Sequence, residues 1–332
     1  MKAMLLSQNK PIEENPLVLT EVPEPVPGPG EVRVKVRACG MCRTDLHVIE
    51  GELPLARSPI IPGHQIVGVV DRLGPETSRF KPGDRLGIAW LRKTCGTCSY
   101  CREGKENLCE NSRFTGYHAD GGFAEYAVVP EDFAYQIPSV FTDAEATPLL
   151  CAGIIGYRAL RRSELKPGQS LAIYGFGSSA HIVIQIALHR GCEVYVCTRG
   201  EKHQELARQM GAAWAGGATD PPPLKVDSAI VFAPAGELVP IALRSLRKGG
   251  TLSLAGIYMT QIPAMDYTES LFYERNIHSV TSNTRQDGLD LLREAAEIPI
   301  RPRVETFPLE EANRALQMLK AGEINGTGVL II

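Results

Sequence analysis

The chain has 332 residues, of which 44% are hydrophobic and 22% charged, and its formal net charge is −3. This composition is ordinary for a globular protein of about two domains, and the charge gives no basis for binding nucleic acid or an anionic membrane. The N-terminal apolar run in MKAMLLSQNK is too short for a signal peptide, and no apolar stretch reaches the roughly 18 residues of a membrane span. We therefore expect a cytoplasmic protein with reduced cysteines and with no nucleic-acid or membrane partner.

The sequence pattern of residues 1–152 is typical of a β domain. Short β-branched runs such as Val32–Val36 and Ile66–Val70 lie between turns rich in glycine and proline. Such runs, bounded by turn residues, are typical of short strands. We predict a mostly β domain here.

Residues 153–284 change to an alternation of apolar strands and helices. The alternation predicts a doubly wound parallel sheet of the α/β class. The expected strands are Leu171–Tyr174, Glu193–Cys197, Ser228–Phe232 and Thr251–Leu254, and the expected helices are Ile182–Arg190 and Lys202–Met210.

Residues 285–332 again resemble the first part. Leu309, Ala312, Leu316 and Leu319 have helical spacing, and Gly322 follows them as a stop signal. An Asn-Gly turn then leads to the strand-like run Val329–Ile332. We expect this segment to return to the β domain and complete it.

A glycine-rich turn, GFGSSAH, stands between a predicted strand and a predicted helix. In that context it matches the dinucleotide-binding fingerprint, in which the first glycine permits a tight turn and the second lets the backbone approach a pyrophosphate. The alternative is a plain strand-to-helix turn. The expected coenzyme contacts are Gly175, Phe176, Gly177, Ser178, Ser179 and Ala180.

The end of the second predicted strand bears on coenzyme choice. An NAD site usually carries a carboxylate there for the ribose 2′-hydroxyl, but this chain has Thr198 and Arg199. An arginine can pair with a 2′-phosphate. We therefore expect NADP(H) as the preferred coenzyme, with NAD(H) as the alternative in which Glu201 binds the ribose.

Four cysteines lie within residues 95–109, in the spacing C-x2-C-x2-C-x7-C. Dense cysteines in a cytosolic chain favour a metal over disulfides. An iron–sulfur cluster and a zinc ion are both candidates, although the last interval is too long for the bacterial ferredoxin run.

A second constellation is scattered, in CGMCRTDLH (39–47), PGHQIVG (62–68) and PLLCAG (148–153). Together with the cysteine cluster and the glycine-rich turn, and in this order, these motifs resemble the zinc-dependent alcohol dehydrogenases of the medium-chain dehydrogenase/reductase superfamily. The resemblance covers essentially the whole chain. It implies a GroES-like β domain with an inserted Rossmann domain.

The resemblance also implies two zinc ions. A catalytic zinc is expected on Cys42, His64 and Cys151, and these three ligands leave a fourth position open for water or substrate. An alcohol bound at that position loses its proton readily and can pass hydride to the nicotinamide. A structural zinc is expected on four thiolates, which fill the tetrahedron. Its ligands are Cys95, Cys98, Cys101 and Cys109.

Further roles follow from the same motif. Thr44 and His47 match the family's proton relay, Asp45 matches the carboxylate that orients the zinc-binding histidine, and Arg43 matches a contact to the coenzyme pyrophosphate. Two positions depart from the family pattern. Gln65 stands where Glu is usual, and Thr327 stands where an arginine commonly binds the pyrophosphate.

The implied activity is hydride transfer between a small alcohol and NAD(P), reversible as aldehyde reduction. Trp90 and Tyr117 fall near the family's substrate cleft and suit a primary aliphatic or aromatic alcohol. The alternatives are a polyol or amino-alcohol dehydrogenase, and a nucleotide-binding zinc protein without catalysis. The family leads us to expect a homo-oligomer, either a dimer or a tetramer.

Overall fold

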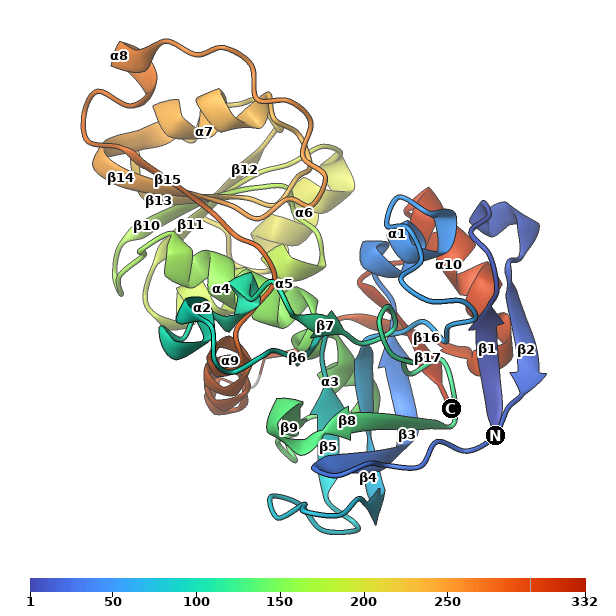
Figure 1. The fold of residues 1–332 in the computed structure, drawn as a ribbon. Helices are drawn as coiled ribbons and strands as arrows, with labels where there is room; N and C mark the ends of the chain where they lie inside the picture. The colour runs from blue at the N-terminus through green and yellow to red at the C-terminus, as the bar shows by residue number, and fades with distance from the viewer. Residues whose placement is uncertain (299) are drawn as a thin grey trace. The chain divides into compact units, whose positions relative to one another are not determined.

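The computed structural model describes residues 1–298 and 300–332 and divides into two compact units (Figure 1). Unit 1 comprises Met1–Cys151, Ser282–Ala296 and Arg301–Ile332, and unit 2 comprises Ala152–Thr281 and Glu297–Ile300. The sequence predicted boundaries after residues 152 and 284, and the two units change over after Cys151 and after Thr281. Unit 1 is therefore discontinuous in sequence.

The core of unit 1 is a seven-stranded sheet in the order β16-β17-β3-β4-β5-β9, with β8 also paired to β3. Alternate residues of β3 (Glu31–Gly40), among them Val32, Val34 and Val36, are buried, as expected for β-branched side chains on a pleated surface. The other strands are β4 (Gln65–Leu73), β5 (Arg85–Ile88), β8 (Tyr126–Pro130), β9 (Ala134–Gln136), β16 (Val304–Pro308) and β17 (Thr327–Ile331). Two small sheets pair β1 (Lys2–Leu6) with β2 (Leu17–Glu21) and β6 (Leu91–Lys93) with β7 (Arg113–Phe114).

The end of the chain completes this sheet. β17 pairs antiparallel with β3, with Leu330 opposite Cys39. The expected tail helix begins as a 3₁₀ turn, continues as α10 (Ala312–Ala321) and ends at Gly322 with φ +75°. The other helices of unit 1 are α1 (Arg43–Glu50), α2 (Ser99–Arg102), α3 (Asp143–Ala146) and α9 (Arg285–Glu297), and its 3₁₀ turns are 12–14, 106–108, 131–133, 147–150 and 309–311.

Unit 2 contains a six-stranded parallel sheet in the order β12-β11-β10-β13-β14-β15. Helices α4 and α5 lie on one face and α7 on the other (Figure 1). The predicted combination of a doubly wound parallel sheet and a β domain in one chain is thus confirmed. The strands are β10 (Ser170–Tyr174), β11 (Glu193–Cys197), β12 (Trp214–Gly216), β13 (Val226–Val231), β14 (Leu246–Leu254) and β15 (Asn276–Ser279), and the helices are α4 (Ala152–Arg162), α5 (Ser178–His189), α6 (Glu201–Gln209), α7 (Leu238–Ser245) and α8 (Tyr267–Ser270).

Asp227 joins the starts of three of these strands. The backbone N–H and the hydroxyl of Ser170 donate to its Oδ2 at 2.9 and 2.7 Å, and Arg247 Nε lies 2.6 Å from its Oδ1. Burial opposes ionisation of Asp227, but these hydrogen bonds and the charge of Arg247 outweigh it and lower the pKa of the carboxyl.

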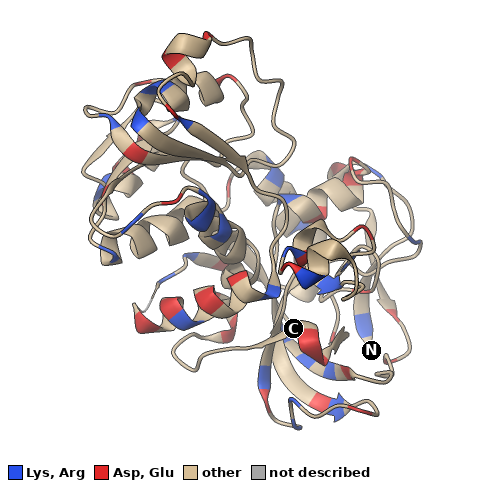
Figure 2. Cartoon of the chain, turned by 60° about the vertical axis from the view of Figure 1, so that its left-hand side comes forward, with Lys and Arg blue, Asp and Glu red and all other residues tan. Residues whose placement is uncertain are grey.

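Basic and acidic residues are interspersed along the helices and strands of both units (Figure 2). This distribution agrees with the small net charge of −3. Among the described helices, none has the length and apolarity needed to cross a membrane.

Candidate metal and coenzyme sites

Three side chains from distant parts of unit 1 converge on one point. Cys42 precedes α1, His64 precedes β4, and Cys151 follows the 3₁₀ turn 147–150. The Sγ atoms of Cys42 and Cys151 are 3.7 Å apart, and each lies 3.4 Å from Nε2 of His64. The expected catalytic trio is therefore brought together.

These separations fit a tetrahedral zinc ion. With Zn–S of about 2.3 Å and Zn–N of about 2.05 Å, two tetrahedral ligand atoms lie about 3.8 Å apart for two sulfurs and about 3.6 Å apart for sulfur and nitrogen. The observed distances agree to within about 0.2 Å, the tolerance for a plausible metal site. A zinc ion held by these three atoms would have one of its four tetrahedral positions left open.

The electrostatics of the trio favour positive charge at its centre. The hydrogen bond from Cys151 lowers the pKa of Cys42, with His64 lowering it further against the effect of burial. Burial disfavours the charged imidazolium of His64, yet the charges of Asp45 and Cys42 raise its pKa to about 10. A divalent cation supplies the same positive charge in place of the proton.

Asp45 fixes the orientation of two of the ligands. Its Oδ2 accepts from the backbone N–H of Cys42 at 2.9 Å, as the reciprocal half of the cap that starts α1, and its Oδ1 lies 3.1 Å from Nδ1 of His64. A proton on Nδ1 leaves the Nε2 lone pair directed at the two sulfurs. Asp45 is buried, so its place in the structure matches the expected orienting role.

The turn that delivers His64 depends on Gly63. Its φ is +95°, and a Cβ there would lie 2.4 Å from the ring of Phe123, so only glycine fits. The next residue, Gln65, is fully buried, and its amide O and N have no hydrogen-bond partner among the described residues. A buried amide without a partner beside a metal site is a candidate for contact with a ligand of that site.

The four cysteines expected to bind the structural zinc form a separate cluster in unit 1. Sγ of Cys98 lies 3.5 Å from that of Cys101, and Sγ of Cys95 lies 3.9 Å from that of Cys101 and 3.6 Å from that of Cys109. Backbone N–H groups of Thr97 and Cys98 lower the pKa of Cys95 to about 6, which favours the thiolate that zinc requires. Four thiolates at these separations fit a closed tetrahedral site.

An ion pair that the sequence did not reveal, with a buried carboxylate and a half-exposed guanidinium, joins the segment of this cysteine cluster (residues 95–109) to α9. Glu106, between Cys101 and Cys109, accepts from the backbone N–H of Arg285 at 2.7 Å and from its guanidinium at 2.8–3.1 Å. The guanidinium also lies over the ring of Phe133, 4.5 Å from the centroid. The segment of residues 95–109 thus contacts α9, which comes from the C-terminal part of unit 1.

Aromatic rings line one side of the metal trio. The edge-on pair of His64 and Trp90 has centroids 5.0 Å apart, and Trp90 stacks on Phe114 at 4.9 Å and on Tyr117 at 6.0 Å. The Tyr117 hydroxyl donates to the Pro54 carbonyl at 2.9 Å. Trp90 thus lies beside the trio, and Tyr117 stacks on Trp90. No sequence motif marks Phe114 as a member of this stack.

Helix α1 carries the expected relay residues. The backbone N–H of Thr44 donates to Sγ of Cys42 at 3.4 Å, and Thr44 is half-buried. Nδ1 of His47 forms an ion pair with Glu52, because the loop after α1 folds back and Leu53 donates to the His47 carbonyl at 2.9 Å. Glu52 was not expected at the site, and no sequence motif marks it.

Arg43, the expected pyrophosphate contact, and Thr327, which stands where the family commonly has an arginine, lie in different settings. Arg43 is exposed, and its Nη2 donates to the carbonyl of Lys320 at 3.3 Å. Thr327 is buried at the start of β17, and its N–H donates to the Arg303 carbonyl at 2.9 Å.

The glycine-rich turn in unit 2 opens a pocket of about 370 Å³. Gly175 has φ +92°, and a Cβ there would lie 2.8 Å from the backbone of Ala233. A Cβ on Gly177 would meet no protein atom within 4 Å, so this glycine leaves space for a ligand to approach the backbone. Gly175, Phe176 and Gly177 line the pocket, whereas Ser178, Ser179 and Ala180 form the first turn of α5.

The residues expected near the 2′ group of the coenzyme ribose line the same pocket. Thr198 and Arg199, which follow β11, line it together with His203 and Glu237. Glu201 begins α6 and is exposed. His203 had not been singled out from the sequence, because only its place on the first turn of α6 brings it to the pocket.

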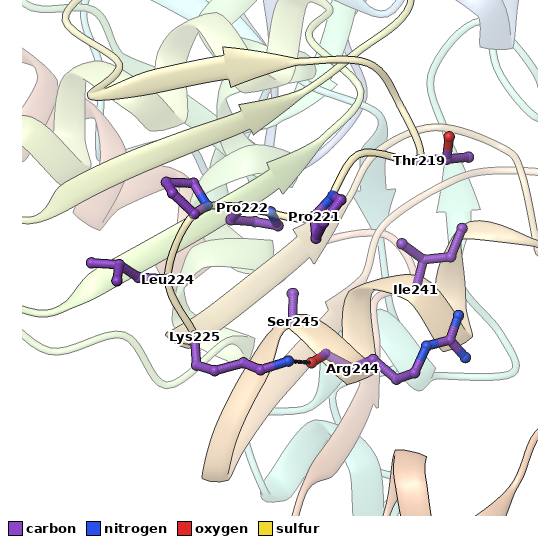
Figure 3. Close-up of a pocket in the computed structure, with 9 residues that line it drawn as sticks. Thr219, Pro221, Pro222, Leu224, Lys225, Ile241, Arg244 and Ser245 are labelled. Atoms are coloured by element: carbon purple, nitrogen blue, oxygen red, sulfur yellow. Dashed lines mark hydrogen bonds between the residues drawn. The ribbon is translucent and has the colours of Figure 1, made fainter.

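A second pocket of unit 2, of about 700 Å³, lies between the segment after β12 and helix α7 (Figure 3). Of its described lining residues, none is a histidine, cysteine or carboxylate, so they offer no set of metal ligands. The lining residues are Thr219, Pro221, Pro222, Pro223, Leu224, Lys225, Ile241, Arg244 and Ser245, and Lys225 donates to the Arg244 carbonyl.

Comparison with known proteins gives consistent matches over the whole chain. Residues 28–139 match the alcohol dehydrogenase GroES-like domain, and residues 180–297 match the zinc-binding dehydrogenase family. The chain is 51% identical over 337 residues to a probable alcohol dehydrogenase of Mycobacterium tuberculosis, covering 100% of this chain and 97% of that one. An alcohol dehydrogenase of Geobacillus stearothermophilus is 37% identical over 347 residues, covering 99% of both.

Solved structures share the fold. A cinnamyl alcohol dehydrogenase from Sorghum bicolor superposes with a TM-score of 0.88 at 26% identity, covering 99% of this chain and 97% of that one.

Proposed function

Because the chain belongs to the zinc-type alcohol dehydrogenases of the medium-chain dehydrogenase/reductase superfamily, and so exchanges hydride between alcohol and aldehyde with NAD(P), we propose that its substrates are primary aliphatic or aromatic alcohols. We further propose that it works in reverse as an aldehyde reductase and prefers NADP(H). The observation that carries the catalytic assignment is the convergence of two thiol sulfurs and one imidazole nitrogen at 3.4–3.7 Å.

The proposed metal ligands are Cys42, His64 and Cys151. These three residues would hold a zinc ion, which would supply Lewis-acid polarisation of an alcohol or carbonyl oxygen. Two thiolates and a neutral imidazole compensate the charge of the ion. Asp45 holds His64 in the tautomer that presents Nε2.

The proposed proton path begins at Thr44 and continues through His47. The hydroxyl of Thr44 lies on the residue whose N–H contacts Sγ of Cys42, which supports a place for it beside the reacting oxygen. His47 is the proposed next member of the path, because an imidazole can both accept and donate a proton. Its contact with Glu52 fixes the orientation of the ring.

The position of Trp90 supports the proposed substrate class. Its ring lies edge-on to His64 at 5.0 Å and is backed by Phe114 and Tyr117. A flat wall of this kind accepts an extended chain or an aromatic ring and leaves less room for branching at the reacting carbon. The sorghum relative, a cinnamyl alcohol dehydrogenase, agrees with an aromatic substrate.

Arg199 supports the proposed coenzyme. It lines the pocket at the position where an NAD site carries a carboxylate, and its guanidinium can make charge-assisted hydrogen bonds to a 2′-phosphate. Arg43 and the open backbone at Gly177 are the proposed contacts for the pyrophosphate.

We also propose a structural zinc on Cys95, Cys98, Cys101 and Cys109, which gives two zinc ions per chain. The closed geometry of four thiolates leaves no position for substrate. Metal analysis of the purified protein tests this stoichiometry.

A homo-oligomer is the proposed assembly, with two copies meeting along β15. This strand ends the order of the unit 2 sheet, and the exposed rings of Tyr267, Phe272 and Tyr273 precede it. An unpaired edge next to apolar side chains favours pairing with another copy. Light scattering should give a molar mass that is a multiple of the 36.1 kDa chain, and Phe272→Glu should lower this molar mass. A monomeric wild type would contradict this proposal.

The test of the catalytic proposal is a substrate panel. Primary, secondary and aromatic alcohols, with the matching aldehydes and ketones, are assayed with NADPH and NADH or their oxidised forms. We expect the highest kcat/KM for primary substrates with NADP(H). A clear preference for NADH, or for secondary alcohols, would overturn the corresponding part.

A further inference from the structure

A pocket of about 480 Å³ in unit 1 is bordered mainly by basic side chains. Among its described lining residues, four are basic and one is a carboxylate, and none of them lines the coenzyme pocket or belongs to the metal trio. The basic residues are Arg92 and Lys93 of β6, Arg113 of β7 and His118 after β7, and the carboxylate is Glu31 of β3.

The carboxylate of this pocket is already engaged. Oε1 of Glu31 accepts from Nη2 of Arg92 at 2.9 Å, and its Oε2 accepts from the backbone N–H of Gly28 at 3.0 Å. Asp120 lies outside the lining and is paired with Arg57 at 3.1 Å. Glu31 and Arg92 therefore balance each other, and the charges of the remaining basic side chains are not offset by Glu31.

Lys93 and Arg113 place two like charges opposite each other. They are partners in the antiparallel register of β6 and β7, and like charges at directly opposite positions repel each other. Both side chains are exposed, and within residues 1–298 and 300–332 neither forms an ion pair or a side-chain hydrogen bond. The repulsion is therefore not offset by the described part of the chain.

His118 adds a hydrogen-bond donor to these two cations. Its Nδ1 accepts from the backbone N–H of Phe114 at 3.2 Å, so the neutral ring carries its proton on Nε2. Burial and the positive charge of Arg113 lower the pKa of His118, which favours this neutral form. The imidazole thus offers an N–H group without adding a third uncompensated charge.

We propose that this pocket binds a phosphate group, with Lys93, Arg113 and His118 as its contacts. A phosphate monoester carries about −1.5 to −2 charges at neutral pH and has three strong acceptor oxygens. Its charge matches the two uncompensated cations, and its oxygens match the three donor side chains. A single carboxylate would leave one of the two positive charges without a counter-charge.

The other walls of the pocket leave room for an organic part of the ligand. Pro29, Ala119 and Pro130 supply apolar surface beside the basic residues. The volume of about 480 Å³ falls within the range of about 300–1,000 Å³ that is typical of small-molecule sites. The phosphate can therefore belong to a small phosphorylated molecule or be inorganic phosphate, and the test distinguishes these sources.

The test is calorimetric titration of the purified protein with inorganic phosphate and with ethyl phosphate. It is done at about pH 8, where both probes keep their second charge, at low ionic strength, and with saturating NADPH so that the probes do not bind at the coenzyme pocket. Lys93→Gln and Arg113→Gln are compared with Lys35→Gln and Arg37→Gln. The two controls remove exposed charges of β3 that do not line the pocket.

We expect Lys93→Gln and Arg113→Gln each to weaken binding of both probes about tenfold, because each removes one charge-assisted contact. The control variants should change the affinity less than about twofold. Without phosphate, the two pocket variants should have thermal midpoints no lower than the wild type, since the repulsion across β6 and β7 is relieved. Phosphate should raise the midpoint of the wild type more than that of Arg113→Gln.

Tighter binding of ethyl phosphate than of inorganic phosphate would support the site and assign it to a phosphorylated molecule. Equal or tighter binding of inorganic phosphate would support the site with phosphate itself as the ligand. Three results would overturn the proposal: no phosphate binding by the wild type, binding that Lys93→Gln and Arg113→Gln leave unchanged, or equal weakening by the control variants, which would indicate a general effect of net charge.

Discussion

Replacing Glu106 with glutamine is expected to destabilise unit 1 by about 2–3 kcal/mol. Glu106 is only 7% exposed, and its carboxylate accepts from the backbone N–H, Nε and Nη2 of Arg285. The glutamine side chain keeps one acceptor but turns an NH₂ group toward the guanidinium. The positive charge of Arg285 then loses its buried partner.

The size of the effect follows from the burial of the two partners. Removing one member of a buried pair costs about 3–5 kcal/mol when the other remains uncompensated. The Arg285 side chain is 37% exposed, so water compensates part of its charge. This places the expected loss toward the lower end of that range or below it.

The assay is urea unfolding followed by the fluorescence of Trp90 in a Trp214→Phe background. The chain has two tryptophans, so Trp90 then reports on unit 1 alone. Glu110→Gln is the matched control, because it removes an exposed carboxylate beside Cys109 and should cost less than about 0.5 kcal/mol.

A double-mutant cycle separates pairing from general charge effects. If Glu106 and Arg285 act as a pair, Glu106→Gln combined with Arg285→Gln costs far less than the sum of the single losses. Strict additivity, or a Glu106→Gln loss no larger than that of Glu110→Gln, would refute the reasoning.

Four further predictions concern other parts of the chain. Gly288→Ala places a Cβ 2.5 Å from the Tyr135 ring; the overpacking cost of about 1–3 kcal/mol exceeds the helix-propensity gain of about 1 kcal/mol, so the thermal midpoint should fall, and a rise would contradict this packing. Cys101→Ser should reduce the zinc content from about two ions to about one per chain, measured by atomic emission, and lower the thermal midpoint; an unchanged content would exclude a zinc on the four thiolates. Asp227→Asn should lower the free energy of unfolding above about pH 4 but have little effect well below it. The reason is that a carboxyl with a lowered folded pKa stabilises the protein above its unfolded pKa, and this stabilisation is lost as the pH falls through the folded pKa. Equal losses of stability at pH about 2.5 and about 7 would contradict this prediction. Gly177→Val should leave the thermal midpoint of the nucleotide-free protein nearly unchanged, since its Cβ meets no protein atom within 4 Å, yet weaken NADPH binding at least about tenfold in a fluorescence titration; unchanged affinity would place the pyrophosphate elsewhere.

Periodic patterns in unit 2 were sufficient to predict its fold. The strand β11 was predicted with its observed bounds, because an apolar run between a glycine turn and a polar helix permits few alternatives. β15 was missed because its residues are exposed or half-buried, and such a strand is specified by its neighbour β14 rather than by its own sequence.

The metal trio could be assigned from the sequence only through family resemblance. Cys42, His64 and Cys151 are separated by loops whose closure no local pattern encodes. The same limit applies to contacts between distant segments. The ion pair of Glu106 with Arg285 spans 179 residues, and a lone glutamate or arginine has no sequence feature that distinguishes a buried partner from a solvated one.

The pairing of β17 with β3 has a consequence for synthesis of the chain. β3 lies in the middle of the unit 1 sheet, yet one of its neighbours consists of residues 327–331. Unit 2 is nearly continuous between residues 152 and 281, so most of it can fold as it leaves the ribosome. Along one edge of β3, β8 can already pair with Glu31–Lys35, whereas Ala38–Gly40 stay unpaired until residues 327–331 emerge. The nascent N-terminal third therefore leaves this short stretch of β3 without its partner strand during the whole elongation of unit 2, and an unpaired strand edge is a site that a chaperone can protect.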